Sequence, residues 1–236
     1  MTWGEHSGRA GERATEFTTI AGMRFEGFGE HAVEYYDGLL ADNSKAYYED
    51  NKQIYLEQVR APMEALLAEL EGEFGEFGTG KVFRPYRDLR FAKDKTPYKT
   101  HCGAVLERGR GGGALYMQLS SDGLLVGAGC FHTEPDQLAR LRTALDEDRR
   151  GGELQDLIDG LTRKGWELRG DTMKTKPRGV APDHPRLELL RHRSLYLVRE
   201  WEPDNLLHER GLLRRVRDSW RTARPLTEWF VDHVGV

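Results

Sequence analysis

Apolar residues recur at intervals of three and four along the first third of the chain, which predicts amphipathic helices. Over residues 25–43 these positions are Phe28, Ala32, Tyr35, Leu39 and Leu40. Asn43 or Ser44 can cap a second helix over residues 44–59, and Pro62 suits the first turn of a third helix over 62–74. The inward positions predicted for these two helices are Tyr48, Tyr55, Val59, Met63, Leu66, Leu67 and Leu70. The opening third is therefore predicted to be helical.

The middle of the chain changes to short runs rich in β-forming residues. Residues 101–107, 114–121 and 124–132 are predicted to form antiparallel strands, with residues 81–87 as a fourth strand. The pair Asp122-Gly123 between two of these runs is typical of a hairpin turn. The Arg-Gly stretch at residues 108–113 is predicted to be a mobile hairpin loop.

Helical spacing returns over residues 135–146 and 153–164, and strands are predicted at 166–170 and 194–201. A loop at 175–185 and a short helix at 187–191 lie between these strands, and a helical end begins near residue 204. Helices at both ends of a central group of strands favour a single α+β domain over residues 23–236. We expect N-terminal helices, a mostly antiparallel central sheet and flanking helices, preceded by a flexible tail over residues 1–22.

Composition narrows the classes of function. The chain has 236 residues, of which 38% are hydrophobic, and a net charge of −4, so no overall positive field attracts nucleic acid. No stretch approaches the roughly 18 consecutive apolar residues of a membrane span, so no membrane association is expected. Two cysteines are too few for a disulfide framework, and the polar N-terminus does not resemble a secretory signal. A cytoplasmic location is the expectation, while the oligomeric state stays open.

Residues 81–101, which we call the basic segment, differ from the rest of the chain. They carry seven lysines and arginines and two aspartates, a local balance of +5. Clustered like charges cost free energy unless water or an anion relieves them. Tyr86, Phe91, Tyr98 and two prolines interleave with these bases, which indicates an ordered loop instead of a solvated run of charges.

Three interpretations of the basic segment remain open. In the first, it forms a pocket for a small molecule that carries a phosphate or carboxylate, with Asp88 and His101 as candidate acid–base groups. The candidate anion-binding residues are Arg84, Arg87, Arg90, Lys93, Lys95, Tyr98 and Lys99. In the second, the same bases follow a nucleic-acid backbone while tyrosines stack on bases. In the third, Asp88 and Asp94 pair with neighbouring bases and brace a long loop against the sheet, in a structural or interaction protein that has no ligand.

Other groups of residues add smaller hypotheses. His101-Cys102 and Cys130-x-His132 could supply zinc ligands if their strands were neighbours, but ordinary strand cysteines fit as well, so no metal site is predicted. The C-terminal helix carries a stripe of arginines that either faces water and local acids or extends the basic surface. These arginines are Arg210, Arg214, Arg217, Arg221 and Arg224.

The basic loop 174–179 is either solvated or a lid over the anion. Any cofactor is unknown from the sequence, and so is whether the protein is an enzyme.

The stretch FRPYRDLRFAKDKTPYKTH, residues 83–101, resembles the hallmark motif of the domain of unknown function 2461 family. The preceding residues 38–63 are similar to the family's N-terminal helices, including Asn43, Lys52, Tyr55 and Pro62. Similarity continues downstream to residue 231. The resemblance implies a shared α+β fold and carries no reaction with it.

Overall fold

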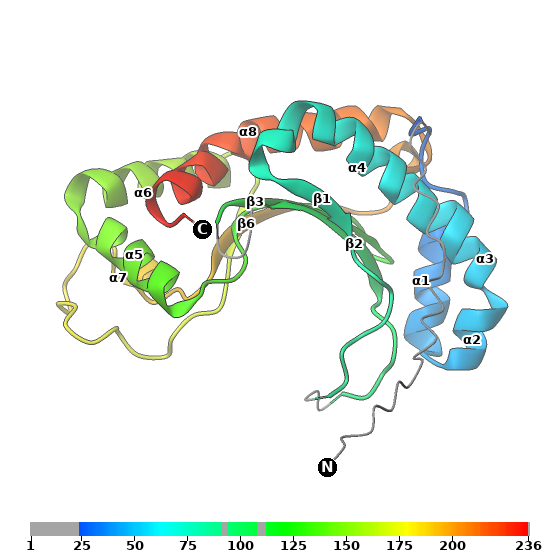
Figure 1. The fold of residues 1–236 in the computed structure, drawn as a ribbon, viewed down its shortest axis with the longest axis horizontal. Helices are drawn as coiled ribbons and strands as arrows, with labels where there is room; N and C mark the ends of the chain where they lie inside the picture. The colour runs from blue at the N-terminus through cyan, green and yellow to red at the C-terminus, as the bar shows by residue number, and fades with distance from the viewer. Residues whose placement is uncertain (1–23, 91–93, 108–111, 236) are drawn as a thin grey trace, which may run out of the picture.

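The structure, a computed structural model, describes residues 24–90, 94–107 and 112–235. The predicted tail over residues 1–22, the candidate residue Lys93 and most of the Arg-Gly loop lie outside these residues. The described chain folds around one continuous hydrophobic core. It forms a curved sheet with helices α4 and α8 along its convex face (Figure 1).

The opening third is helical, as predicted. Its elements are α1 (Ala32–Ala41), α2 (Lys45–Asp50), α3 (Lys52–Ile54), a π-helical turn (Tyr55–Arg60) and α4 (Ala61–Phe74), followed by a 3₁₀ turn (Gly75–Phe77). The Ser44 hydroxyl accepts the Tyr47 backbone N–H at 3.1 Å and so caps α2. Pro62 occupies the first turn of α4, as predicted, directly after the π-helical turn, and donates no N–H to the helical ladder.

Two expectations for the first helix are wrong. It begins at Ala32 instead of residue 25, because the Phe28 N–H pairs with the Leu207 carbonyl at 2.8 Å and Gly27 before it has a φ of 129°, outside the helical region. Leu40 is 56% exposed, whereas Tyr36 is buried in the core. The core lies on a slightly different face of α1 than the spacing predicted.

The strands form a six-stranded sheet within the described residues, in the order β1-β2-β3-β4-β6-β5, and every pairing is antiparallel. The strands are β1 (Thr79–Val82), β2 (His101–Glu107), β3 (Ala114–Ser120), β4 (Gly123–Cys130), β5 (Glu167–Arg169) and β6 (Leu195–Trp201). Gly123 follows the turn between β3 and β4 with φ of 98°, which a residue with a side chain rarely adopts. The α+β fold class predicted from the sequence is confirmed.

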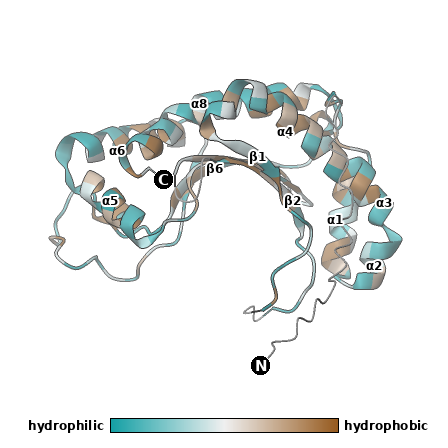
Figure 2. Cartoon of the chain, viewed as in Figure 1, coloured by the Kyte–Doolittle hydropathy of each residue, from teal (hydrophilic) through white to brown (hydrophobic). Residues whose placement is uncertain are grey.

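The remaining helices cover the convex face and one end of the sheet. They are α5 (Pro135–Asp146), α6 (Asp148–Thr162), α7 (Leu187–Leu190), a 3₁₀ turn (Asn205–His208) and α8 (Gly211–His233). Hydrophobic residues recur between hydrophilic ones along these helices, as expected for elements with one buried face (Figure 2). No helix in the described ranges is both long and apolar enough to cross a membrane.

Trp220 of α8 lies at the centre of the contact between helices and sheet. Its side chain is fully buried, and its indole N–H donates to the Tyr116 carbonyl of β3 at 3.1 Å. The Phe74 ring of α4 meets it edge-on at 5.5 Å between centroids. One side chain thus joins α8, α4 and the sheet on which the basic segment is built.

Candidate functional site

The basic segment is an irregular extension of the hairpin formed by β1 and β2. The predicted fourth strand ends at Val82, earlier than expected, since Pro85 has no N–H to continue the ladder. Pairing resumes beyond it, where Tyr86 and Tyr98 form an isolated antiparallel bridge. The Lys99 N–H donates to the Pro85 carbonyl at 2.8 Å, so both sides of the segment stay joined.

Contacts with α2 and the turn before it hold this extension in place. The Asn43 side chain donates to the Tyr98 carbonyl at 3.1 Å and accepts the Tyr98 N–H at 3.0 Å. These two bonds replace the backbone pairing that a neighbouring strand would supply. The Tyr98 ring stacks on Tyr48 of α2 at 4.3 Å, and Tyr86 packs against both rings.

A cleft of about 950 Å³ lies between this hairpin and the helical segment from α2 to the π-helical turn. We call it the basic cleft. Its lining residues are Tyr48, Lys52, Tyr55, Leu56, Arg60, Lys81, Val82, Phe83, Arg84, Pro85, Tyr86 and Lys99. Basic and apolar residues line it together, and no carboxylate belongs to this lining.

Lys81, Arg84 and Lys99 form the electrostatic centre of the basic cleft. The Lys99 ammonium donates to the Arg84 carbonyl at 3.0 Å and lies 5.0 Å from the centroid of the Phe83 ring. Burial, followed by the charges of Arg84 and Lys81, lowers the pKa of Lys99. Within the described residues, none of these three cations forms an ion pair with a carboxylate. Their mutual repulsion is the condition that a bound anion would relieve.

The π-helical turn supplies the opposite wall. Tyr55 and Arg60 lie at its two ends and both line the basic cleft. Arg60 is held by Glu64 at 2.9 Å, and burial raises the pKa of Tyr55 above its usual range. The Cys102 thiol is buried beneath them, and burial raises its pKa to about 12, so it is not a reactive thiolate. Short π-helical turns inside helices recur at functional sites.

The candidate residues identified from the sequence do not all lie in one site. Arg84 and Lys99 line the basic cleft. Arg87, Tyr98 and His101 line a second, smaller cleft of about 450 Å³, which also borders Lys99. Burial, followed by the nearby Lys99, lowers the pKa of His101, so its imidazole is neutral at pH 7.

The outer part of the segment braces itself with internal ion pairs. Arg87 bonds to Asp94 and Thr96, and Arg90 bonds to Asp88 with its closest atoms 2.6 Å apart. The hydrogen bonds from Arg90 lower the pKa of Asp88 to about 2, which makes this carboxylate a weak base. The Lys95 ammonium donates to the Leu89 carbonyl at 3.0 Å. None of these residues lines the basic cleft, so the bracing interpretation describes this part of the segment.

The cysteine–histidine pairs do not converge. In the ladder, His101 lies opposite Ser120, and Ser120 lies opposite Gly123, at one end of β4. Cys130 is at the other end of the same strand, about 23 Å from Gly123 at roughly 3.3 Å per residue. Throughout residues 24–90, 94–107 and 112–235, no group of three or more His, Cys, Asp or Glu side chains is arranged to hold a metal ion.

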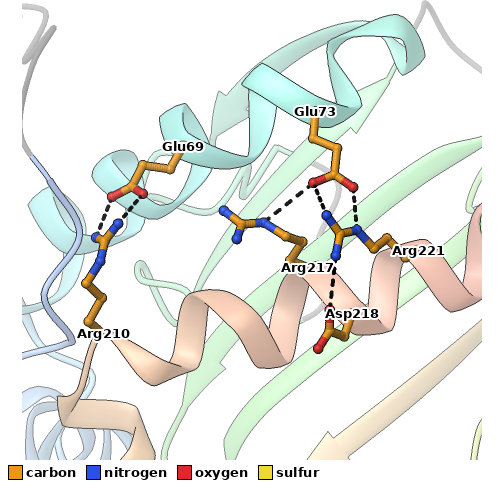
Figure 3. A network of polar contacts seen from close by, with 6 residues as sticks. All are labelled: Glu69, Glu73, Arg210, Arg217, Asp218 and Arg221. Atoms are coloured by element: carbon orange, nitrogen blue, oxygen red, sulfur yellow. Dashed lines mark hydrogen bonds and ion pairs between the residues drawn. The ribbon is translucent and has the colours of Figure 1, made fainter.

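The arginine stripe of α8 faces acidic residues of α4 (Figure 3). Arg210 binds Glu69 through two hydrogen bonds of 2.8 Å, and Arg221 binds Glu73. Arg217 also reaches Glu73, at 3.5 Å, and Arg224 pairs with Glu76 and Glu228. Carboxylates thus engage four of the five arginines and hold α8 against α4, while Arg214 is exposed to solvent. None of the five lines the basic cleft.

The basic loop 174–179 is not a lid over this cleft. It follows β5, at the edge of the sheet opposite β1, and lies beside α5 and α7 (Figure 1). The cleft lies at the other end, between β1 and the segment that contains α2 and α3. The order of the strands therefore separates the two basic loops.

The Glu69–Arg210 pair gives a testable contribution to stability. Glu69→Gln is expected to lower the free energy of unfolding at pH 7 by about 1 kcal/mol, since the pair is partly open to solvent. The hydrogen bond from Arg210 lowers the pKa of Glu69, so this stabilisation is present above the unfolded-state pKa of about 4.3. It is lost as the pH falls through the folded-state value. Urea unfolding should show a smaller difference in the free energy of unfolding between wild type and Glu69→Gln at pH 3 than at pH 7.

Asp218→Asn is the matched control, because Asp218 touches Arg221 only at 3.4 Å on an exposed surface. Its effect should be smaller at both pH values. A difference between wild type and Glu69→Gln that grew in acid would contradict the assigned role of Glu69.

Several residues of the basic cleft were not among the candidates from the sequence. Lys52, Tyr55 and Arg60 come from the helical segment, and Lys81 comes from β1. One signal was present, because Tyr48, Lys52 and Tyr55 are spaced by four and three residues and so share one helical face. Which part of the chain this face meets is decided by the tertiary fold.

Comparisons with known proteins agree with the resemblance seen in the hallmark motif. A family model described as conserved hypothetical protein (DUF2461) matches residues 31–229, which includes both walls of the basic cleft. A search of curated proteins found no match. The match spans most of the sequence, and the chain therefore belongs to the DUF2461 family of conserved hypothetical proteins.

Proposed function

We propose that this protein binds a small molecule carrying a phosphate or carboxylate group in the basic cleft. One observation carries the proposal: Lys81, Arg84 and Lys99 meet there without a carboxylate partner among the described residues. An anion bound between them would make charge-assisted hydrogen bonds and remove their mutual repulsion. Cys102 and Cys130 form no disulfide, which suits the cytoplasmic location expected from the sequence.

Nucleic-acid binding is the less favoured alternative. It depended on a surface that joined the basic segment to the arginines of α8. Four of those five arginines, all except Arg214, are engaged by Glu69, Glu73 and Glu76, and none of the five lines the basic cleft, which is a local patch. A local patch of this size suits one or two anionic groups better than a long backbone.

Arg84→Ala tests the proposal, because Arg84 is exposed and its side chain has no role in the core. Thermal-shift titrations would use inorganic phosphate, pyrophosphate and citrate as probes, with Kd measured by calorimetry. We expect at least one of these anions to stabilise the wild type. Arg84→Ala should weaken its binding about tenfold or more, as expected for loss of a charge-assisted contact.

Arg90→Ala is the matched control. It removes an arginine from the same segment, but one that pairs with Asp88 outside the basic cleft. Its affinity should stay within about twofold of wild type, within the range of a surface change. The proposal is overturned if no probe stabilises the wild type, or if Arg84→Ala and Arg90→Ala weaken binding equally.

A further inference from the structure

The apolar residues that line the basic cleft indicate which class of anion would fit there. Beside its cations, the cleft is lined by Tyr48, Leu56, Phe83 and Tyr86. A site for inorganic phosphate alone would need only hydrogen-bond donors and charge. These apolar side chains add contact area for a part of the ligand that is itself apolar.

Tyr86 presents a ring to the cleft that the fold has already oriented. It is held by Tyr98 and Tyr48 at centroid distances of 5.4 and 5.7 Å, with tilted rings, and by the bridge to Tyr98. Even so, 45% of Tyr86 remains exposed. Leu56, from the π-helical turn on the other wall, is 42% exposed. Two large apolar side chains from opposite walls are therefore accessible in one cleft.

A purely structural role does not account for the exposed part of Tyr86. Packing of the hairpin against α2 is supplied by Tyr98, which is 4% exposed and stacks on Tyr48 at 4.3 Å. Tyr86 adds to this contact with part of its surface and leaves the remainder open. Because the ring of Tyr86 is already held in place, little side-chain conformational entropy is lost when a ligand stacks on its exposed part.

Arg84 and Tyr86 lie on either side of Pro85, where the chain bends, and both line the basic cleft. Their Cα atoms are at most about 7 Å apart, because one residue extends the chain by no more than about 3.6 Å. Both are exposed, while Pro85 between them is half-buried. A charged group at Arg84 and a flat ring at Tyr86 would thus be separated by only a few bonds in the ligand.

Resting on the proposed function, we propose that the anion bound in this cleft carries a planar aromatic ring close to its charged group. A nucleoside monophosphate or an aryl phosphate has this chemistry. The charged group lies among Lys81, Arg84 and Lys99, and the ring lies between Tyr86 and Leu56. The cleft volume of about 950 Å³ is large enough for a molecule of this size.

Paired probes test the ring separately from the charge. Calorimetry would compare AMP with ribose 5-phosphate, and phenyl phosphate with methyl phosphate, since each pair differs mainly in the ring. We expect the wild type to bind the ring-bearing member of at least one pair about tenfold more tightly. Tyr86→Leu should remove this preference, whereas Tyr86→Phe should keep it. Leu40→Ala, which changes an exposed leucine outside the basic cleft, should leave the affinities for the ring-bearing and the ring-free probes unchanged.

The possible results separate the two proposals. If both members of each pair bind with equal affinity, and Arg84→Ala weakens the binding of every probe, the proposal of an aromatic ring is wrong and the proposal of an anion site remains. Failure of every probe and of inorganic phosphate to bind would overturn both. A 5′-phosphorylated oligonucleotide that binds far more tightly than AMP would overturn a small-molecule ligand. Loss of the preference in both Tyr86→Leu and Tyr86→Phe would assign it to the hydroxyl and also overturn the ring.

Discussion

Trp220→Ala is expected to destabilise the protein by about 3–5 kcal/mol, the largest effect of any single change considered. The indole is fully buried between α8, α4 and the sheet, and its removal leaves a cavity that these elements cannot close together. It also leaves the Tyr116 carbonyl without the indole N–H that bonds to it at 3.1 Å. Urea unfolding at pH 7, with the midpoint and slope fitted separately, measures the change.

Trp220→Phe separates packing from hydrogen bonding. It keeps a ring against Phe74 and loses the N–H donor, so its expected cost is about 1–2 kcal/mol. An alanine variant as stable as the phenylalanine variant would show that the indole does not fill the core as its burial indicates. Neither substitution touches the basic cleft, so anion affinity measured well below the unfolding midpoint should be unchanged.

Asn43→Ala is expected to cost about 2–4 kcal/mol, because it leaves both the N–H and the carbonyl of Tyr98 without partners. The effect reaches the site, since Asn43 fixes the backbone between Pro97 and Lys99. We therefore expect weaker binding of any anion that stabilises the wild type, together with faster amide exchange at Tyr98. Urea unfolding and hydrogen exchange would measure the two consequences.

Asn51→Ala is the matched control, since the Asn51 side chain donates only to the Tyr47 carbonyl, 2.9 Å away within its own helical segment. Its cost should be below about 1 kcal/mol, without an effect at Tyr98. If amide exchange at Tyr98 were equally fast in both variants, the assigned role of Asn43 would be wrong.

Local charge identified the basic segment, whereas the tertiary structure determined which of its residues line the basic cleft. Unequal charge density marked the basic segment, and this part of the hypothesis required only composition. It could not separate Arg84, which lines the basic cleft, from Arg87 and Arg90, which bond to Asp94 and Asp88. All three are arginines in one short run, so only the path of the backbone distinguishes them.

Long-range pairing also explains where the predicted elements differ from the observed ones. The helix predicted over residues 25–43 begins about two turns later, at Ala32, because the Phe28 N–H bonds to Leu207, far away along the chain. Helical spacing alone contains no signal of that partner. Likewise, the arginines of α8 had the spacing of a basic stripe, and the acids that pair with Arg210, Arg217 and Arg221 come from α4.

The sequence by itself determined the α+β class, most helices and strands, and the segment where positive charge collects, since periodicity, turn residues and local charge are properties of neighbouring residues. Only the tertiary structure decided that Lys52 and Arg60 join Lys81, Arg84 and Lys99 around one cleft. It also decided that Cys130 lies far from His101. Such proximities depend on strand order and on which helical face meets which hairpin, and these are fixed by packing over the whole chain.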